Sequence, residues 1–296
     1  MPDATRQKTI AIIGAGPAGL MAGEVLAGLG HKVDIFDSMP SVARKFLMAG
    51  KSGLNITHGE AYQAFRQRYF EANDFLSEAL DQFTPDDVRA WCEGLGQEVF
   101  TGTSGRVFPK SMKGSPLLRA WLKRLSDLGV TIHTRHRWIG SDGSKHRFST
   151  PDGEIAFETD ALLLALGGAS WPRLGSDATW VDNLTKRGIE IAPFAPANCG
   201  FERHWSDIMR ERFAGEPLKG VAIETASGRS EGEFVISSYG VEGSLIYSHA
   251  KQLRDDLAAH GIAHFTLDLL PGRSVERIEK DLLRVSAKDS FSNRLR

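Results

Sequence analysis

The stretch that decides the fold is TIAIIGAGPAGLMAGEVLAGLGHKVDIFD, residues 9–37. Its first five residues are β-branched or small and apolar, which is typical of a strand buried on both faces of a parallel sheet. A glycine-rich turn follows, and then an alanine- and leucine-rich helical segment, after which Gly30 is placed to act as a left-handed cap. Residues 32–37 alternate like a second strand. The stretch therefore predicts a β–α–β unit with parallel strands.

The turn of this unit reads Gly14-Ala15-Gly16-Pro17-Ala18-Gly19. Gly14 permits a tight turn, Gly16 has no side chain to block a pyrophosphate, and Gly19 lets the helix pack closely on the strand. The helix N-terminus offers free N–H groups and a partial positive charge to phosphates. Asp37, which ends the second strand, can accept hydrogen bonds from the ribose hydroxyls of an adenosine. These features predict a Rossmann-like dinucleotide-binding domain, and the alternative is a glycine-rich turn that holds no ligand.

The segment after the second strand bears on which dinucleotide is bound, because the glycine motif alone does not separate FAD from NAD. Residues 43–58 read ARKFLMAGKSGLNITH and are rich in basic, glycine, serine and asparagine residues. Such a connection can place backbone donors, a lysine and an amide along a diphosphate or a flavin edge. It favours FAD, although a solvated basic loop has the same composition.

The rest of the chain alternates helical and strand-like patterns. Helical patterns cover residues 70–95 and 116–128, and Thr84 is a good N-cap within the first of them. Residues 130–136 are expected to form a strand, and residues 161–166 a buried one. The other expected elements are a hairpin or meander at 141–160, short strands at 198–201, 220–225, 233–237 and 265–269, and helices at 248–260 and 274–285.

Composition excludes several classes of protein. The 296 residues are 41% hydrophobic and 25% charged, which rules out a disordered, collagen-like or coiled-coil chain. The 36 Lys and Arg residues nearly balance 37 Asp and Glu residues, and this argues against a nucleic-acid partner and against an anionic membrane surface. The two cysteines and nine histidines show no metal-ligand spacing, so we expect no metal site. Few cysteines and no recognisable leader favour a cytoplasmic protein.

Several strings of this sequence resemble the HI0933/YhiN-type flavoprotein family, which belongs to the FAD superfamily with two dinucleotide-binding domains. Besides the two segments quoted above, they are GRVFPKS at 105–111, LLLALGGASWPRLGSD at 162–177, PANCGF at 196–201 and EFVISSYGVEGSLIY at 233–247. The resemblance covers nearly the whole chain. It implies an FAD-dependent oxidoreductase in which hydride passes through flavin N5, taken either from NAD(P)H as electron donor or from a small-molecule substrate.

The resemblance also implies an α/β fold in which a β-barrel and helical insertions cover the flavin. We therefore expect a Rossmann-like FAD-binding domain over residues 1–190, a β-rich, barrel-like insertion over residues 191–247 and a partial helical region over residues 248–296. The glycine-rich C-terminal segment that completes the flavin site in such proteins does not follow Gly272. We expect either a shortened form or a flavin pocket that is open on the isoalloxazine side.

Carried onto this sequence, the family pattern gives cofactor-binding roles to the glycine turn, to Asp37 and to a further set of residues. Leu54 stands where many members have cysteine, so no thiol chemistry is expected there. The further cofactor-binding residues are Lys45, Gly53 and Asn55 in the basic loop, His136 and Arg137 near the adenine, and Gly167 and Gly168 in a second glycine turn. The substrate-side candidates are Arg106, Trp171, Tyr239, Gly240 and Gly243.

Two other functions stay open at this point. A non-catalytic nucleotide-binding or scaffold protein would keep the glycine turn and show no turnover. An FAD-dependent RNA-modifying protein is the second, since related folds serve that chemistry, although the near-neutral charge argues against it. No side chain stands out in the sequence as a catalytic acid or base.

Overall fold

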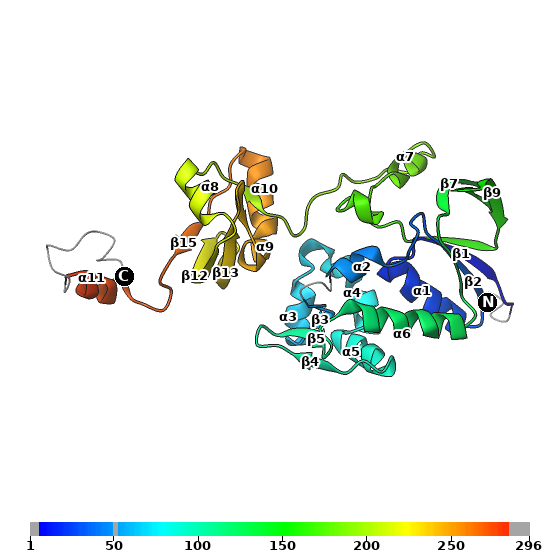
Figure 1. Ribbon diagram of the computed structural model, residues 1–296, viewed down its shortest axis with the longest axis horizontal. Coiled ribbons are helices and arrows are strands. Elements are labelled where there is room, and N and C mark those ends of the chain that lie inside the picture. The colour runs from blue at the N-terminus through cyan, green and yellow to red at the C-terminus, as the bar shows by residue number, and fades with distance from the viewer. Residues whose placement is uncertain (1–5, 50–52, 284–296) are drawn as a thin grey trace. The chain divides into compact units, whose positions relative to one another are not determined.

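The structure is a computed structural model that describes residues 6–49 and 53–283. The chain divides into two compact units, Met1–Phe194 and Ala195–Arg296, and most of their elements are labelled in Figure 1. The first unit ends at Phe194, whereas the sequence predicts that the first domain ends at residue 190. Residues 50–52 of the basic loop and residues 284–296 of the predicted helical region lie outside the described residues.

A four-stranded parallel sheet with the order β10-β1-β2-β6 forms the centre of unit 1. The predicted β–α–β unit is confirmed, because α1 (Pro17–Gly28) connects two parallel strands in which Ile10 pairs with Val33. The strands of this sheet are β1 (Thr9–Ile13), β2 (Lys32–Phe36), β6 (Thr131–His133) and β10 (Ala161–Leu164).

The two faces of this sheet have separate apolar cores. On one face Ile12 packs with Leu20 of α1 and with Trp121 of α6 (Gly114–Asp127). On the other face Phe36 packs with Phe148 of an antiparallel meander. Cover on both faces explains why β1 reads as a continuous run of β-branched and apolar residues, and why four successive residues of β2 are buried. The meander consists of β7 (Arg137–Asp142), β8 (Lys145–Thr150) and β9 (Gly153–Glu158).

The strand β10 differs from the buried strand that the sequence predicts. It pairs only with β1 and lies at the edge of the sheet, where Ala161 and Leu164 are exposed. An apolar run indicates a strand, but it carries no information about whether a neighbouring strand covers that strand. The prediction of burial was therefore wrong for part of this segment.

Helices and a small sheet complete unit 1. The helical pattern over 70–95 gives two main helices, because Thr84 begins a new one. The Thr84 side chain accepts from the Asp87 N–H, and the Asp87 carboxylate accepts from the Thr84 N–H at 2.8 Å, so the predicted N-cap is confirmed. The remaining elements are α2 (Arg44–Ala49), α3 (Tyr62–Gln67), α4 (Asn73–Gln82), α5 (Pro85–Gly94), α7 (Trp180–Thr185), β3 (Thr57–His58), β4 (Val99–Thr101), β5 (Arg106–Pro109) and the 3-10 turns Phe70–Ala72 and Pro172–Leu174.

An antiparallel five-stranded sheet with the order β11-β14-β13-β12-β15 forms unit 2. Its core joins Ile223 and Phe234 of the sheet to Leu245 and Ile246 of the short helix α9. β15 pairs with β12, so this part of the predicted helical region contributes to the sheet. The elements are β11 (Phe201–Glu202), β12 (Pro217–Thr225), β13 (Gly228–Ile236), β14 (Gly240–Glu242), β15 (Thr266–Asp268), α8 (Asp207–Phe213), α9 (Ser244–Ser248), α10 (Ala250–His260) and α11 (Val275–Leu283).

A buried histidine in the meander makes the stability of unit 1 depend on pH. His146 is 3% exposed, and its ring nitrogens lie 2.8 Å from Ser141 Oγ and 2.9 Å from Thr159 Oγ1. Burial lowers the pKa of His146, and the positive charge of Arg187 lowers it further. The folded state therefore holds this imidazole neutral below the ordinary pKa of 6.5, at which the unfolded chain already takes up a proton.

The free energy of unfolding is expected to fall as pH drops from 8 to 6, because protons bind the unfolded chain more strongly in this range. In unit 2, His249 lowers the free energy of unfolding in the same pH range, since burial lowers its pKa as well. In His146→Gln the free energy of unfolding should fall less between pH 8 and pH 6 than in the wild-type protein, because one of the two buried imidazoles is removed. Urea unfolding at pH 8, 7 and 6 measures this, and equal falls in the two proteins would contradict it.

Candidate dinucleotide-binding site

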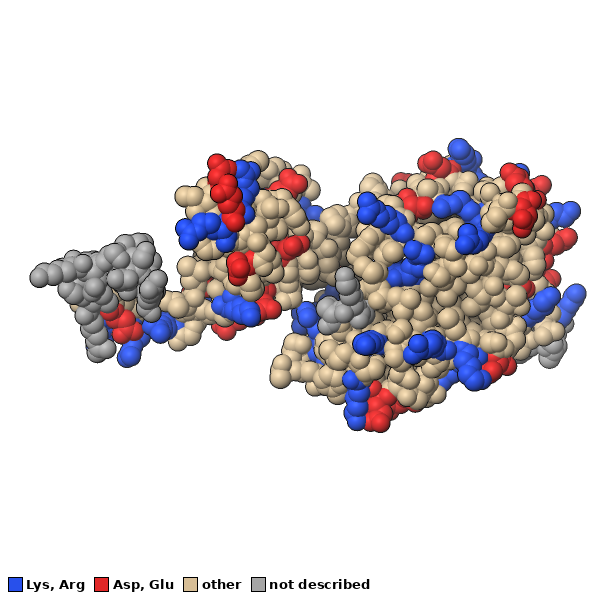
Figure 2. All heavy atoms as spheres, in the orientation of Figure 1, with Lys and Arg blue, Asp and Glu red and all other residues tan. Residues whose placement is uncertain are grey.

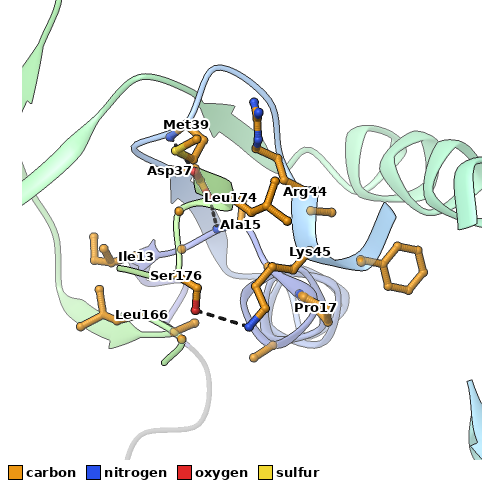
Figure 3. A pocket seen from close by; sticks show the side chains of 18 of the residues that line it. Ile13, Ala15, Pro17, Asp37, Met39, Arg44, Lys45, Leu166, Leu174 and Ser176 are labelled. Carbon is orange, nitrogen blue, oxygen red and sulfur yellow. Dashed lines mark hydrogen bonds between the residues drawn. The ribbon is translucent and has the colours of Figure 1, made fainter. Parts of the chain in front are cut away.

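A cavity of about 1030 Å³ opens in unit 1 at the carboxyl ends of β1, β2 and β10. Ligands of parallel α/β sheets bind at this edge, and the volume is at the upper end of the range for ligand sites. The lining includes the glycine turn, the segment after β2, the start of α2, the residues that join β6 to β7 and the segment after β10. Figure 3 shows the side chains around the turn.

The three glycines of the turn have different surroundings. A Cβ on Gly14, whose φ is +105°, would lie 2.3 Å from the carbonyl oxygen of Ala165. A Cβ on Gly19 would lie 1.8 Å from the carbonyl oxygen of Gly14. A Cβ on Gly16 would meet no atom within 4 Å, and Gly16 lines the cavity. Two glycines are thus required by close packing of the backbone, whereas the third keeps the cavity open.

The N-terminus of α1 lies at this cavity, and no side chain of the described residues caps it. Gly16 is the N-cap and makes no side-chain hydrogen bond, Pro17 follows at the first helical position, and the first turn has no acidic residue. The free N–H groups and the helix dipole favour an anion at such a terminus. The site therefore has the donors that a diphosphate requires.

Asp37 holds the turn in shape. Its Oδ2 accepts the N–H of Ala15 at 2.8 Å, and its Oδ1 accepts the N–H of Met39 at 2.8 Å (Figure 3). The N–H of Gly14 donates to the carbonyl of Phe36 at 2.7 Å, which ties the turn to the end of β2. Each carboxylate oxygen can accept a further hydrogen bond. Contact between Asp37 and ribose hydroxyls stays a prediction.

Lys45 connects the start of α2 to the segment after β10. Its Nζ donates to Ser170 Oγ at 2.7 Å and to Ser176 Oγ at 3.4 Å, the second of which is drawn in Figure 3. Ser176 in turn donates to the carbonyl of Gly168 at 2.9 Å. Lys45 and Ser176 line the cavity. An anionic ligand there would replace the neutral serine hydroxyls as the hydrogen-bond acceptor of the Lys45 ammonium group.

Two lining residues have buried donors that no protein atom satisfies. Arg44 donates from its terminal nitrogen to Ser41 Oγ at 3.3 Å, whereas its Nε has no partner among the described residues. The indole N–H of Trp180 is likewise buried and without an acceptor in the described part of the chain. Buried unpaired donors are rare in folded proteins. These donors and the open space at Gly16 fit an acceptor-rich, anionic ligand such as a dinucleotide.

The structure brings most of the predicted cofactor residues to one cavity. Of the predicted set, Gly19, Gly53 and Gly168 do not line it: Gly19 packs against the carbonyl of Gly14, Gly53, at a φ of +127°, packs against Met112, and the carbonyl of Gly168 accepts from Ser176. Sequence reasoning did not assign Arg44, although it stands in the basic loop that was singled out. The predicted residues that line the cavity are Gly14, Ala15, Gly16, Pro17, Ala18, Asp37, Lys45, Asn55, His136, Arg137 and Gly167.

The substrate-side candidates do not gather at this cavity. Arg106 is exposed on β5 and is absent from the lining, as is Trp171, which is 45% exposed. Tyr239, Gly240 and Gly243 lie in unit 2. There Tyr239 donates to Glu242 at 2.9 Å, and a Cβ on Gly240 would lie 1.9 Å from the carbonyl of Phe201. Gly240 is therefore required by the close approach of β14 to β11. The substrate-side roles of these residues stay predictions.

The described residues offer neither a metal-ligand cluster nor a membrane-spanning helix. Within residues 6–49 and 53–283, no three His, Cys, Asp or Glu side chains are grouped as metal ligands. No helix in those ranges has the length and apolar character needed to cross a bilayer. Cys92 is buried in the core, and burial raises the pKa of its thiol to about 11, so it is an unreactive thiol.

The parallel sheet, the open helix N-terminus and the cavity at the carboxyl edge define a Rossmann-type α/β protein. The family model described as HI0933-like protein Rossmann domain matches residues 8–284. The chain belongs to the HI0933-like family, in agreement with the resemblance of its sequence motifs.

Two curated relatives match most of this chain. It is 27% identical over 273 residues to the ribosomal RNA dihydrouridine synthase of Haemophilus influenzae, covering 90% of this chain and 65% of the relative. It is 23% identical over 276 residues to the 3-dehydro-bile acid delta(4,6)-reductase of Clostridium scindens, covering 92% of this chain and 66% of the relative. The chain thus spans about two thirds of the length of these relatives.

Solved structures with some likeness include THI4 of Thermovibrio ammonificans, at 18% identity and a TM-score of 0.40, over 70% of this chain and 71% of that chain.

Proposed function

We propose that this chain binds FAD in the cavity of unit 1 and acts as a flavin-dependent oxidoreductase with NAD(P)H as electron donor. The observation that carries the proposal is the uncapped N-terminus of α1, which opens onto the cavity beside Gly16. FAD, when bound, supplies reversible hydride transfer at its flavin ring. The similarity to the Clostridium scindens protein that is named as a reductase supports the class of reaction.

The residues of the site have distinct tasks in this proposal. The N–H groups of the turn and the cations of Arg44 and Lys45 bind the diphosphate. Asp37 keeps the turn in shape and accepts from ribose hydroxyls on its remaining lone pairs. The apolar side chains of the lining exclude water from the bound rings.

The experiment titrates the purified chain with FAD and records its visible spectrum and the stoichiometry of binding. We expect one FAD per chain, and oxidation of NAD(P)H when a quinone or dye is supplied as acceptor. A chain that acquires no flavin spectrum would contradict the proposal. Bound FAD without any turnover would favour the alternative, a non-catalytic nucleotide-binding protein.

RNA modification is the second candidate function, favoured by one specific observation. The Haemophilus influenzae relative is named as a ribosomal RNA dihydrouridine synthase, which runs against the expectation that nucleic acid is no partner. In Figure 2, Lys and Arg side chains form small groups on the visible face, and several of these groups lie beside acidic side chains. Binding of ribosomal RNA fragments at low salt tests this candidate, because backbone contacts are strongest there. Absence of binding would remove it.

Removal of the Asp37 carboxylate is expected to weaken FAD binding. Asp37→Ala leaves the N–H groups of Ala15 and Met39 without their acceptor and removes the ribose contact. We expect a loss of about 1–3 kcal/mol in binding, which is usual for a hydrogen bond to a charged group. Asp37→Asn keeps one carbonyl oxygen and should lose less. Quenching of flavin fluorescence gives both affinities, and wild-type affinity in Asp37→Ala would show that the carboxylate does not contribute.

A further inference from the structure

His136 lines the cavity and has one ring nitrogen without a hydrogen-bond partner among the described residues. It lies between β6 and β7 and is part of the lining. Its Nδ1 is 2.7 Å from the carbonyl oxygen of Thr134. A carbonyl oxygen can only accept, so Nδ1 carries the proton, and Nε2 of the neutral imidazole is an acceptor. This Nε2 has no hydrogen-bond partner among the described residues.

Three aromatic rings hold the imidazole in one orientation. The ring centroid of His136 lies 5.8 Å from that of Phe36, 5.5 Å from that of His133 and 6.3 Å from that of Phe148. His133 is itself held, because it stacks on Phe36 at 4.5 Å and bonds to the buried Asp34 at 2.8 Å. An acceptor whose direction is set by packing and by a second hydrogen bond can discriminate between ligands.

The lining near His136 is suited to a flat base. The side chains of Ile13, Leu166 and Trp180 provide apolar surface in the same cavity. The neighbouring Arg137 is turned to other partners, because its Nη1 donates to Asp177 at 3.2 Å and to Thr179 at 2.9 Å. A base that packs on this surface therefore has His136 as a ring acceptor in the same cavity.

We propose that His136 selects the base of the bound nucleotide by accepting a hydrogen bond from an exocyclic amino group, as adenine provides. This inference rests on the proposed function, since it assigns the base end of the same site. Hypoxanthine has a keto oxygen in place of that amino group. Its lone pairs would face the lone pair of Nε2 with no proton between them, so the site rejects it.

The experiment compares ADP with inosine diphosphate by isothermal titration calorimetry on the full chain at pH 8. Wild-type protein should bind ADP at least about tenfold more tightly than inosine diphosphate. His136→Phe keeps an aromatic ring and removes both nitrogens, and the preference should fall to about twofold or less. His136→Asn keeps a donor for the Thr134 carbonyl, but its shorter side chain has no acceptor at the position of Nε2. It should therefore also lose the preference.

His260→Phe, at the end of α10 in unit 2, is the matched control and should keep the full preference. Equal affinity of the wild-type protein for the two nucleotides would overturn the role of His136 and leave dinucleotide binding intact. An unchanged preference in both His136 variants would overturn it as well. If neither ADP nor FAD binds the wild-type chain, the proposed function fails and the base selection fails with it.

Discussion

Gly16→Leu is expected to abolish FAD binding while leaving the fold intact. Gly16 has a φ of −81°, which any residue can adopt, and a Cβ there would meet no atom within 4 Å. The leucine side chain would therefore enter the cavity and not the core, where it occupies the approach of the diphosphate to the helix N-terminus. We expect FAD affinity to fall at least about a hundredfold, because the anion loses its contact with the N–H groups.

Flavin fluorescence titration measures the affinity, and urea unfolding shows that the variant is folded. Gly28→Leu is the matched control, since Gly28 is the last residue of the same helix and a Cβ there also meets no atom within 4 Å. Gly28 is exposed and does not line the cavity, so this control should bind FAD like the wild-type protein. Normal FAD binding by Gly16→Leu would mean that the ligand site lies elsewhere.

The glycine turn could be predicted from the sequence because its determinants are local. The turn, the helix and Asp37 lie within one stretch of residues 9–37, and each glycine has a steric task that spacing alone indicates. The structure agrees for Gly14 and Gly19, which are required by backbone contacts, and for Gly16, which is open. The N-cap at Thr84 was predictable for the same reason, since a cap depends on residues one turn away.

The contacts that complete the site could not be predicted, because they join distant parts of the chain. Lys45 bonds to Ser170, 125 residues later, and no local pattern marks either residue for the other. The sequence assigns Asp37 to a ribose. Its carboxylate also accepts the N–H of Ala15 in the turn, because the ends of β1 and β2 lie next to each other. The exposure of β10 depends on its place in the strand order, which hydrophobicity does not encode.

Gly19→Ala is expected to destabilise unit 1 severely, although it adds only one methyl group. A Cβ at Gly19 would lie 1.8 Å from the carbonyl oxygen of Gly14 and 3.3 Å from the side chain of Ile12. The Gly14 carbonyl cannot move away easily, because its residue is tied to Phe36 by a hydrogen bond of 2.7 Å. The helix must therefore shift from the sheet, and we expect a loss of about 3 kcal/mol or more, at the upper end for overpacking.

Tryptophan fluorescence during urea unfolding reports on this unit, because five of the six tryptophans lie in it. Gly28→Ala is the matched control on the same helix and should raise the free energy of unfolding by about 0.5–1 kcal/mol, since alanine loses less conformational entropy than glycine. The two substitutions add the same methyl group but should change the free energy of unfolding in opposite directions. Wild-type stability in Gly19→Ala would mean that α1 and the turn do not approach each other as closely as the fold requires, and the open helix N-terminus would then lose its structural basis.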